Sequence, residues 1–196
     1  MTSTKKLCIC LCFIATFTWT QSLGQILKFD TKIDVTQSGQ KNTEITYLIQ
    51  IDNKESNWLS EVEIKHSPNE KFNFNYAYIR DKNGDIVRKL KKKEIETRNT
   101  RAYFSFYEDD LLSEFDLYWN SYPYQIEYSY SIQEDQYIFL DVWSPYVYNN
   151  VSSLSSSLQI TIPKNYQVRI KELNGSFNRI ETETDDTKEI RWEYQN

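Results

Sequence analysis

The sequence predicts an all-β domain: a two-layer antiparallel β-sandwich, jelly-roll-like, with few or no helices after an N-terminal signal peptide. The main observation is the stretch 122–133, where large aromatic or aliphatic residues alternate without error with smaller or polar ones. A strand sends every second residue to one face of a sheet, whereas a helix would scatter these side chains. Similar rows recur along the chain, and glycine and proline are few, with four of each. The apolar face of such a sheet needs a second layer to cover it.

Residues 1–24 have the three parts of a secretory signal peptide. Lys5 and Lys6 precede an apolar run from Leu7 to Phe17, and a more polar part follows, with small residues that favour cleavage after Gly24. The apolar run is shorter than the ~20 residues that a membrane-spanning helix needs. We therefore expect an exported protein, periplasmic or extracellular, without stable membrane insertion once the signal peptide is removed.

The mature chain, residues 25–196, is predicted to form a single β-sandwich domain. All three cysteines lie within the first twelve residues, so the mature domain would have no disulfide and would depend on its core. Without the two lysines of the signal peptide, 23 − 2 = 21 basic residues face 28 acidic ones, a net charge of −7. A net acidic surface argues against binding to nucleic acid or to anionic membranes.

The first half of the mature chain contains three alternating rows, each of which predicts a half-buried strand. These rows are Ile45, Tyr47, Ile49 and Ile51; Val62 and Ile64; and Phe72, Phe74, Tyr76 and Tyr78. Asn83-Gly84 tolerates the positive φ angles of a tight hairpin turn, so we expect a strand on each side of it. The lysine-rich run 89–93 is better explained as protection of an exposed strand edge than as a phosphate-binding patch.

The second half is less regular. Ala102, Phe104 and Phe106 predict a strand buried on both faces, and Glu108–Phe115 favours a helical turn whose acids lack the spacing of a calcium loop. We expect 151–157 to be a serine-rich connection. The last third predicts further short rows and one Asn-Gly turn: Leu158, Ile160 and Ile162; Val168 and Ile170; Asn174-Gly175; Ile180 with Thr182 and Thr184; and Ile190, Trp192 and Tyr194.

No catalytic, cofactor-binding or metal-binding residue is predicted, so we do not expect an enzyme. The mature chain has no cysteine to act as a nucleophile, and His66 is the single histidine. One histidine cannot make a two-histidine zinc site, and no nucleophile motif, phosphate loop or dinucleotide fingerprint accompanies it. We expect His66 to lie at the surface.

Aromatic density is the one unusual feature, because eight of the fifteen tyrosines lie between residues 118 and 148. Aromatic side chains at the rim of a sandwich can stack on sugars or anchor a protein partner. They can equally form an aromatic core with partly wet edges. Trp119 and Tyr122, beside Asn120 and Ser121, are the expected exposed pair, and Trp143 is the third candidate for surface binding.

Five segments carry a resemblance to a known family: RDKNGDIV, YFSFYEDD, YPYQIEYSYSI, FLDVWSP and SSLQITIP. Together they resemble the domain of unknown function found N-terminal to transglutaminase-like domains in exported bacterial proteins, over about residues 31–175. The resemblance implies a two-sheet β-sandwich that is usually followed by a papain-like domain with a Cys-His-Asp site. That catalytic domain is not among the 196 residues given, so the resemblance assigns no catalytic role to any of them.

Two classes of function stay open. The first is a non-catalytic accessory or interaction domain of an exported protein, with a transglutaminase-like domain or another exported protein as its partner. The alternative is a free-standing carbohydrate or cell-wall-fragment binding module that uses rim aromatics. Neither requires a cofactor.

Overall fold

The computed structural model describes residues 24–100, 110–148, 151–173 and 177–196. The predicted signal peptide, the predicted strand at Ala102–Phe106 and the predicted Asn174-Gly175 turn lie outside these residues, apart from Gly24. The described part of the chain confirms the predicted fold class, because it is mostly β-strand and forms two sheets. It contains no helix that is long and apolar enough to cross a membrane.

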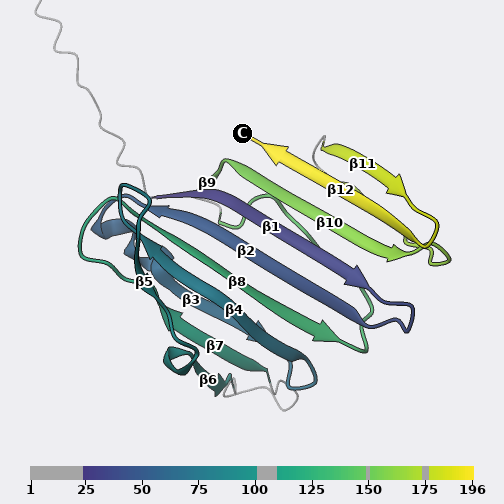
Figure 1. The fold of residues 1–196 in the computed structure, drawn as a ribbon, viewed down its shortest axis with the longest axis horizontal. Coiled ribbons are helices and arrows are strands. Elements are labelled where there is room, and N and C mark those ends of the chain that lie inside the picture. The colour runs from purple at the N-terminus through teal and green to yellow at the C-terminus, as the bar shows by residue number, and fades with distance from the viewer. Residues whose placement is uncertain (1–23, 101–109, 149–150, 174–176) are drawn as a thin grey trace, which may run out of the picture.

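The larger sheet has the strand order β11-β12-β10-β1-β2-β8-β4-β5, and the smaller sheet has the order β3-β7-β6 (Figure 1). The larger sheet contains β1 (Gln25–Val35), β2 (Lys41–Ile51), β4 (Lys71–Arg80), β5 (Ile86–Lys89), β8 (Tyr124–Glu134), β10 (Ser155–Pro163), β11 (Asn178–Glu183) and β12 (Thr187–Gln195), with β9 (Ser152–Ser153) beside β1. The smaller contains β3 (Glu61–His66), β6 (Glu96–Asn99) and β7 (Leu111–Asp116). Two short 3₁₀ helices are η1 (Lys54–Ser60) and η2 (Lys92–Glu94). The pairings are antiparallel except those of β1 with β10 and β9.

Aromatic side chains join the two sheets at the β8–β4 side of the larger sheet, where the smaller sheet lies (Figure 1). On the inner face, the rings of Tyr47 and Tyr128 stack with their centroids 5.0 Å apart. Phe115 of β7 meets Tyr128 edge-on at 5.9 Å and Phe74 of β4 at 5.7 Å. Offset and edge-to-face ring pairs stabilise a core beyond the area that they bury. The smaller sheet is therefore the second layer over this half of the larger one.

The strand predicted at 122–133 is present as β8, with its even-numbered face inward. Tyr124, Ile126 and Tyr128 are buried. On the side of β8 that was predicted to face solvent, Ser129 is an exception. It is buried, and its Oγ accepts a hydrogen bond of 3.1 Å from Asn75 Nδ2.

The row Phe72, Phe74, Tyr76 and Tyr78 does not stay on one face, because β4 has an irregularity in its pairing with β8 between Phe74 and Tyr76. An extra residue in one strand reverses the alternation beyond it. As a result, Phe72 and Phe74 pack against the core, whereas Ala77 and Ile79 replace the two tyrosines as the buried residues. Tyr76 and Tyr78 instead stack on each other, with their ring centroids 5.0 Å apart.

Three other sequence predictions need correction. The helical turn predicted over Glu108–Phe115 is wrong over its described residues, where 111–116 form β7 and pair with both neighbouring strands. The serine-rich connection at 151–157 contains β9 and the first residues of β10, in which Ser156 is buried. Strand β1 was not anticipated, although Phe29, Thr31, Ile33 and Val35 alternate with charged residues.

The inner face of the β1–β10–β12 half is covered by irregular chain. We call residues 135–148, between β8 and β9, the covering segment. Its Leu140 and Trp143 pack on a second apolar cluster together with side chains from 166–177. The buried members of that cluster come from β1, β10 and β12: Ile33, Val35, Leu158, Ile160, Ile162, Ile190 and Trp192. Val168 and Ile170 thus contribute to the core although they lie outside any strand.

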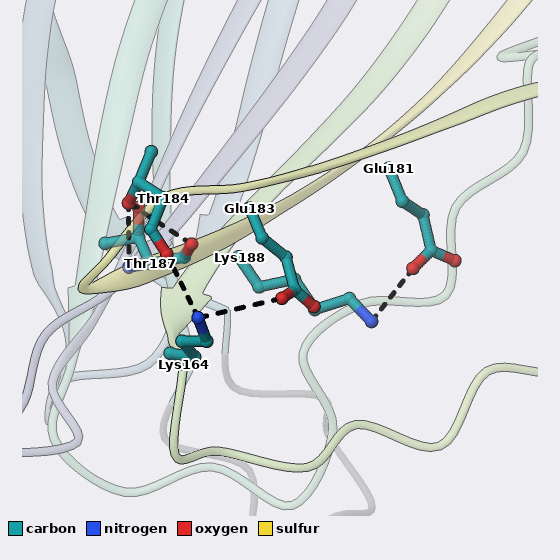
Figure 2. Close-up of polar contacts among 6 residues, drawn as sticks. All are labelled: Lys164, Glu181, Glu183, Thr184, Thr187 and Lys188. Carbon is teal, nitrogen blue, oxygen red and sulfur yellow. Dashed lines mark hydrogen bonds and ion pairs between the residues drawn. The ribbon is translucent and has the colours of Figure 1, made fainter.

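Strand β11 lies at one edge of the larger sheet and exposes all six residues. Figure 2 shows that charged groups cover this edge: Lys188 Nζ lies 2.8 Å from Glu181 Oε2, and Lys164 Nζ lies between the Glu183 carboxylate and the Thr184 carbonyl. Charged side chains on an edge strand oppose pairing with another chain. The predicted hairpin at Asn83-Gly84 is confirmed at the other edge, where it joins β4 to β5 and Gly84 has φ +88°.

Candidate functional site

Exposed aromatic side chains gather where η1, the connection from β7 to β8 and the end of the covering segment meet. We call Trp58, Tyr118, Tyr122 and Tyr148 the aromatic rim. Trp58 is 41% exposed, Tyr118 50% and Tyr148 36%. Trp58 and Tyr148 meet edge-to-face with their ring centroids 5.1 Å apart, at an interplanar angle of 82°. Rings far apart in the sequence therefore form one surface.

Hydrogen bonds connect the segments that carry the rim. The Tyr122 hydroxyl donates to Asn57 Oδ1 at 2.7 Å. The Leu117 amide donates to the Ser60 carbonyl at 2.9 Å, so the chain before Tyr118 is fixed to the end of η1. Burial raises the pKa of the Tyr122 hydroxyl, and a contact with Tyr118 acts in the same direction. The Tyr122 hydroxyl therefore stays protonated at neutral pH and can donate as well as accept.

The three candidate residues from the sequence lie in different environments. Tyr122 and Trp119 are both half-buried and pack against the main core cluster, and Tyr122 also belongs to the rim. Trp143 is half-buried between the two core clusters, and its ring meets Phe177 edge-on at 5.9 Å. The structure thus brings Tyr122 together with Trp58, which sequence reasoning missed. The available signal was a tryptophan in the largely polar stretch between the predicted rows that end at Ile51 and begin at Val62.

The covering segment has a second exposed surface, and this one is apolar. Ile138 is 90% exposed, Phe139 70% and Val142 88%. The three residues fall within five consecutive positions, which span at most about 18 Å. Their neighbours Leu140 and Trp143 point inward, because both pack on the core.

Lys41 holds the covering segment against the end of β2. Its side chain is 7% exposed, and its Nζ forms an ion pair with Glu134, which is 16% exposed. The same Nζ donates to the carbonyls of Phe139 at 3.4 Å and Leu140 at 3.2 Å, and it lies 5.0 Å from the centre of the Tyr137 ring. A buried ammonium needs this many partners to offset the loss of hydration.

A groove of 440 Å³ on the smaller sheet is lined largely by carboxylates. Arg88 pairs with Glu94 at 2.9 Å and Arg98 pairs with Glu114 at 3.0 Å. A hydrogen bond from the Lys91 amide and another from Arg88 lower the pKa of Glu94. Carboxylate oxygens suit hard cations, but among the described residues no three acidic, histidine or cysteine side chains are placed to hold a metal ion.

The prediction that His66 lies at the surface is wrong, since its side chain is 7% exposed. It follows Val62 and Ile64 on the inward face of β3. Its ring stacks on Phe72 at 4.9 Å, and its Nε2 forms a 3.0 Å hydrogen bond with Ser113 Oγ. The histidine therefore joins the two sheets.

Comparison with known proteins identifies a family and several solved structures of similar fold. Residues 37–196 match the family described as a domain of unknown function with a solved structure, DUF3857. A Parabacteroides distasonis protein named a "putative protease" superposes with a TM-score of 0.73 at 16% identity, over 88% of this chain and 35% of that chain. The chain thus spans about a third of that protein's length, and at this identity the match establishes the fold alone. No curated protein matches the chain.

Two enzyme structures match more loosely. Leukotriene A4 hydrolase from Saccharomyces cerevisiae gives a TM-score of 0.37 at 9% identity, over 87% of this chain and 28% of that one. Aminopeptidase A from Legionella pneumophila gives 0.39 at 14% identity, over 89% and 20%. Similarity at this level carries no argument about function.

Proposed function

Because the chain belongs to the DUF3857 family over residues 37–196, a domain of unknown function, we propose that it is a non-catalytic accessory domain of an exported protein. Its partner in this proposal is a transglutaminase-like domain, as the sequence resemblance implies. The fold match supports an accessory role, because the same architecture occurs as one part of a longer protein that is named a "putative protease".

The observation that carries the docking proposal is the apolar surface of the covering segment, formed by Ile138, Phe139 and Val142. Full burial of one such side chain is worth about 1.5–3 kcal/mol, so burying all three would contribute roughly 4.5–9 kcal/mol. Part of that gain offsets the loss of translational and rotational freedom on association. A compact group of exposed apolar side chains is typical of a protein-binding surface.

The surface is held in place before a partner arrives, which lowers the entropy lost on binding. Lys41 fixes the carbonyls of Phe139 and Leu140. Further along the covering segment, the Ser156 hydroxyl donates to the Pro145 carbonyl at 2.9 Å, and the Tyr146 hydroxyl donates to that of Tyr194 at 2.9 Å.

The environment of His66 supports a non-catalytic role. It is the single histidine of the chain, and its ring lies in the core, stacked on Phe72. A general base must reach the proton that it abstracts from a bound substrate. The exposed surfaces of the covering segment and of the rim have no histidine or cysteine near their defining residues.

Docking is tested by calorimetric titration of the full exported chain with a purified transglutaminase-like domain. The DNA beyond codon 196 identifies which domain to use: a continuing frame with cysteine, histidine and aspartate, or the neighbouring gene. We expect Phe139→Asp to weaken binding by about tenfold or more, since it places a charge in an apolar contact. Ile180→Asp is the matched control, because Ile180 is 44% exposed on β11. Equal affinities for the Phe139 variant and the native chain would contradict the proposal.

The non-catalytic role is tested separately. We expect the purified chain to show no amidase, peptidase or glycan-cleaving turnover. Turnover that co-purifies with the chain and disappears in a His66→Gln variant of unchanged melting temperature would show that the chain is an enzyme.

A further inference from the structure

We propose that the aromatic rim is a binding site for a neutral oligosaccharide. This function goes beyond the accessory role, and it uses other residues than the docking surface. The sequence alone suggested Trp119, Tyr122 and Trp143 as candidates, but the packing of Trp119 and Trp143 leaves Trp58, Tyr118 and Tyr148 as the more exposed rings.

The ring geometry suits a sugar. Trp58 and Tyr148 stand nearly perpendicular to each other, with the edge of one ring toward the face of the other. A pyranose has an apolar face of C–H groups, which can stack on an aromatic face, and a polar circumference of hydroxyl groups. Two rings at such an angle give it a flat surface and a side wall.

Neutral hydrogen-bonding groups lie beside the rings. Asn57 accepts from the Tyr122 hydroxyl through Oδ1, and among the described residues its Nδ2 has no partner. Asn120 and Ser121 are exposed in the same connection as Tyr118. Hydroxyl and amide groups both donate and accept, which matches the hydroxyl groups of a sugar.

The charges around the rim exclude strongly charged ligands. Residues 117–123 and 146–148 contain no charged side chain, and within η1 Lys54 and Glu55 balance each other. An anionic polymer would require a group of lysines or arginines, and a basic peptide would require a group of carboxylates.

The backbone that carries the rim is well supported. Asn53 Oδ1 accepts from the Ser56 amide at 3.1 Å, and Ser56 Oγ accepts from the Asn53 amide at 3.2 Å, which caps the start of η1. Leu59, also in η1, is buried as a member of the main core cluster. A rigid platform loses little entropy when a sugar stacks on it.

The test is a titration of the full exported chain with hexasaccharides of cellulose, chitin, laminarin and mannan, followed by tryptophan fluorescence and calorimetry. Dextran sulfate and polygalacturonate serve as anionic probes. We expect at least one neutral hexasaccharide to bind with a Kd below about 1 mM, and Trp58→Ala or Tyr148→Ala to weaken it about tenfold. Ile180→Ala, on the exposed edge strand β11, should bind like the native chain, and melting curves confirm that each variant folds.

Several outcomes would overturn the proposal. These are no binding of any neutral hexasaccharide, tighter binding of the anionic probes, or equal binding by folded Trp58→Ala, Tyr148→Ala and native chains. Loss of transglutaminase-like domain binding in Trp58→Ala without any sugar binding would make the rim a protein contact instead. None of these results depends on whether Phe139 docks a partner.

Discussion

Lys41→Met should destabilise the protein by about 2–4 kcal/mol. Removing one partner of a buried ion pair costs about 3–5 kcal/mol, because the other charge stays buried. Here Glu134 keeps 16% exposure and can be partly hydrated, which lowers this figure. The carbonyls of Phe139 and Leu140 also lose charge-assisted hydrogen bonds, each worth about 1.5–3 kcal/mol, although water can replace part of them. Methionine retains the apolar stem that packs beside Tyr137.

Urea melts of Lys41→Met, Glu134→Gln and the double variant measure this effect. We expect the double variant to be less destabilised than the sum of the singles, by about 1–3 kcal/mol. Hydrogen exchange should accelerate in residues 137–143, which lose their attachment. Lys28→Met is the control: its ion pair with Asp30 involves a lysine that is 53% exposed, so we expect a change below about 1 kcal/mol. A coupling energy under about 0.5 kcal/mol, or unchanged exchange in 137–143, would refute the role of Lys41.

Three further predictions concern the core, the pH dependence and one turn. Tyr128→Ala should lower the free energy of unfolding, measured in urea melts, by about 3–5 kcal/mol, because it empties a large buried aromatic site. Ser129→Ala should lower it by about 1 kcal/mol. Equal small losses in the two variants would mean that the register of β8 is wrong. Burial raises the pKa of Tyr130 from 10.0 to about 12, so its contribution to stability is complete below pH 10 and is lost as the pH rises toward 12. Between pH 10 and pH 12, the free energy of unfolding should fall less steeply with pH for Tyr130→Phe than for the native chain. Gly84→Ala should lower the free energy of unfolding by about 1 kcal/mol, from the positive φ angle alone, because no atom lies within 4 Å of the added Cβ. A loss above about 3 kcal/mol would mean that the added methyl group meets a neighbouring group.

Much of the fold follows from local pattern in the sequence. Strands β2, β3, β8, β10 and β12 follow from period-two rows, because each strand buries one face and leaves the other in a polar environment. The pattern fails where a bulge intervenes, since nothing local shows that Asn75 lies in an irregular pairing that moves Ala77 inward and Tyr76 outward. His66 was misjudged for a related reason: it continues the inward row of β3, but its polarity suggested a surface position.

The binding surfaces could be predicted only in part. Aromatic density near residue 120 directed attention to Tyr122, but Trp58 and Tyr148 meet only through tertiary contacts across about ninety residues of sequence. The apolar surface at Ile138 and Phe139 also depends on which neighbours turn inward. The hydrogen bond from Lys41 and the packing of Leu140 on the core determine which residues of the covering segment turn inward, and local propensity does not.

The position of β1 in the larger sheet has a consequence for synthesis. Asp30 receives a hydrogen bond from Ser157 across 127 residues, and β1 runs parallel to β10 as its neighbour. A nascent chain that emerges N-terminus first can pair β1 with β2 early, but the other edge of β1 stays open until residues 155–163 follow. Pairings this far apart in sequence form slowly, so the open edge persists during elongation. The outward charges of Lys28, Lys32 and Asp34 would then oppose strand exchange between neighbouring nascent chains during that interval.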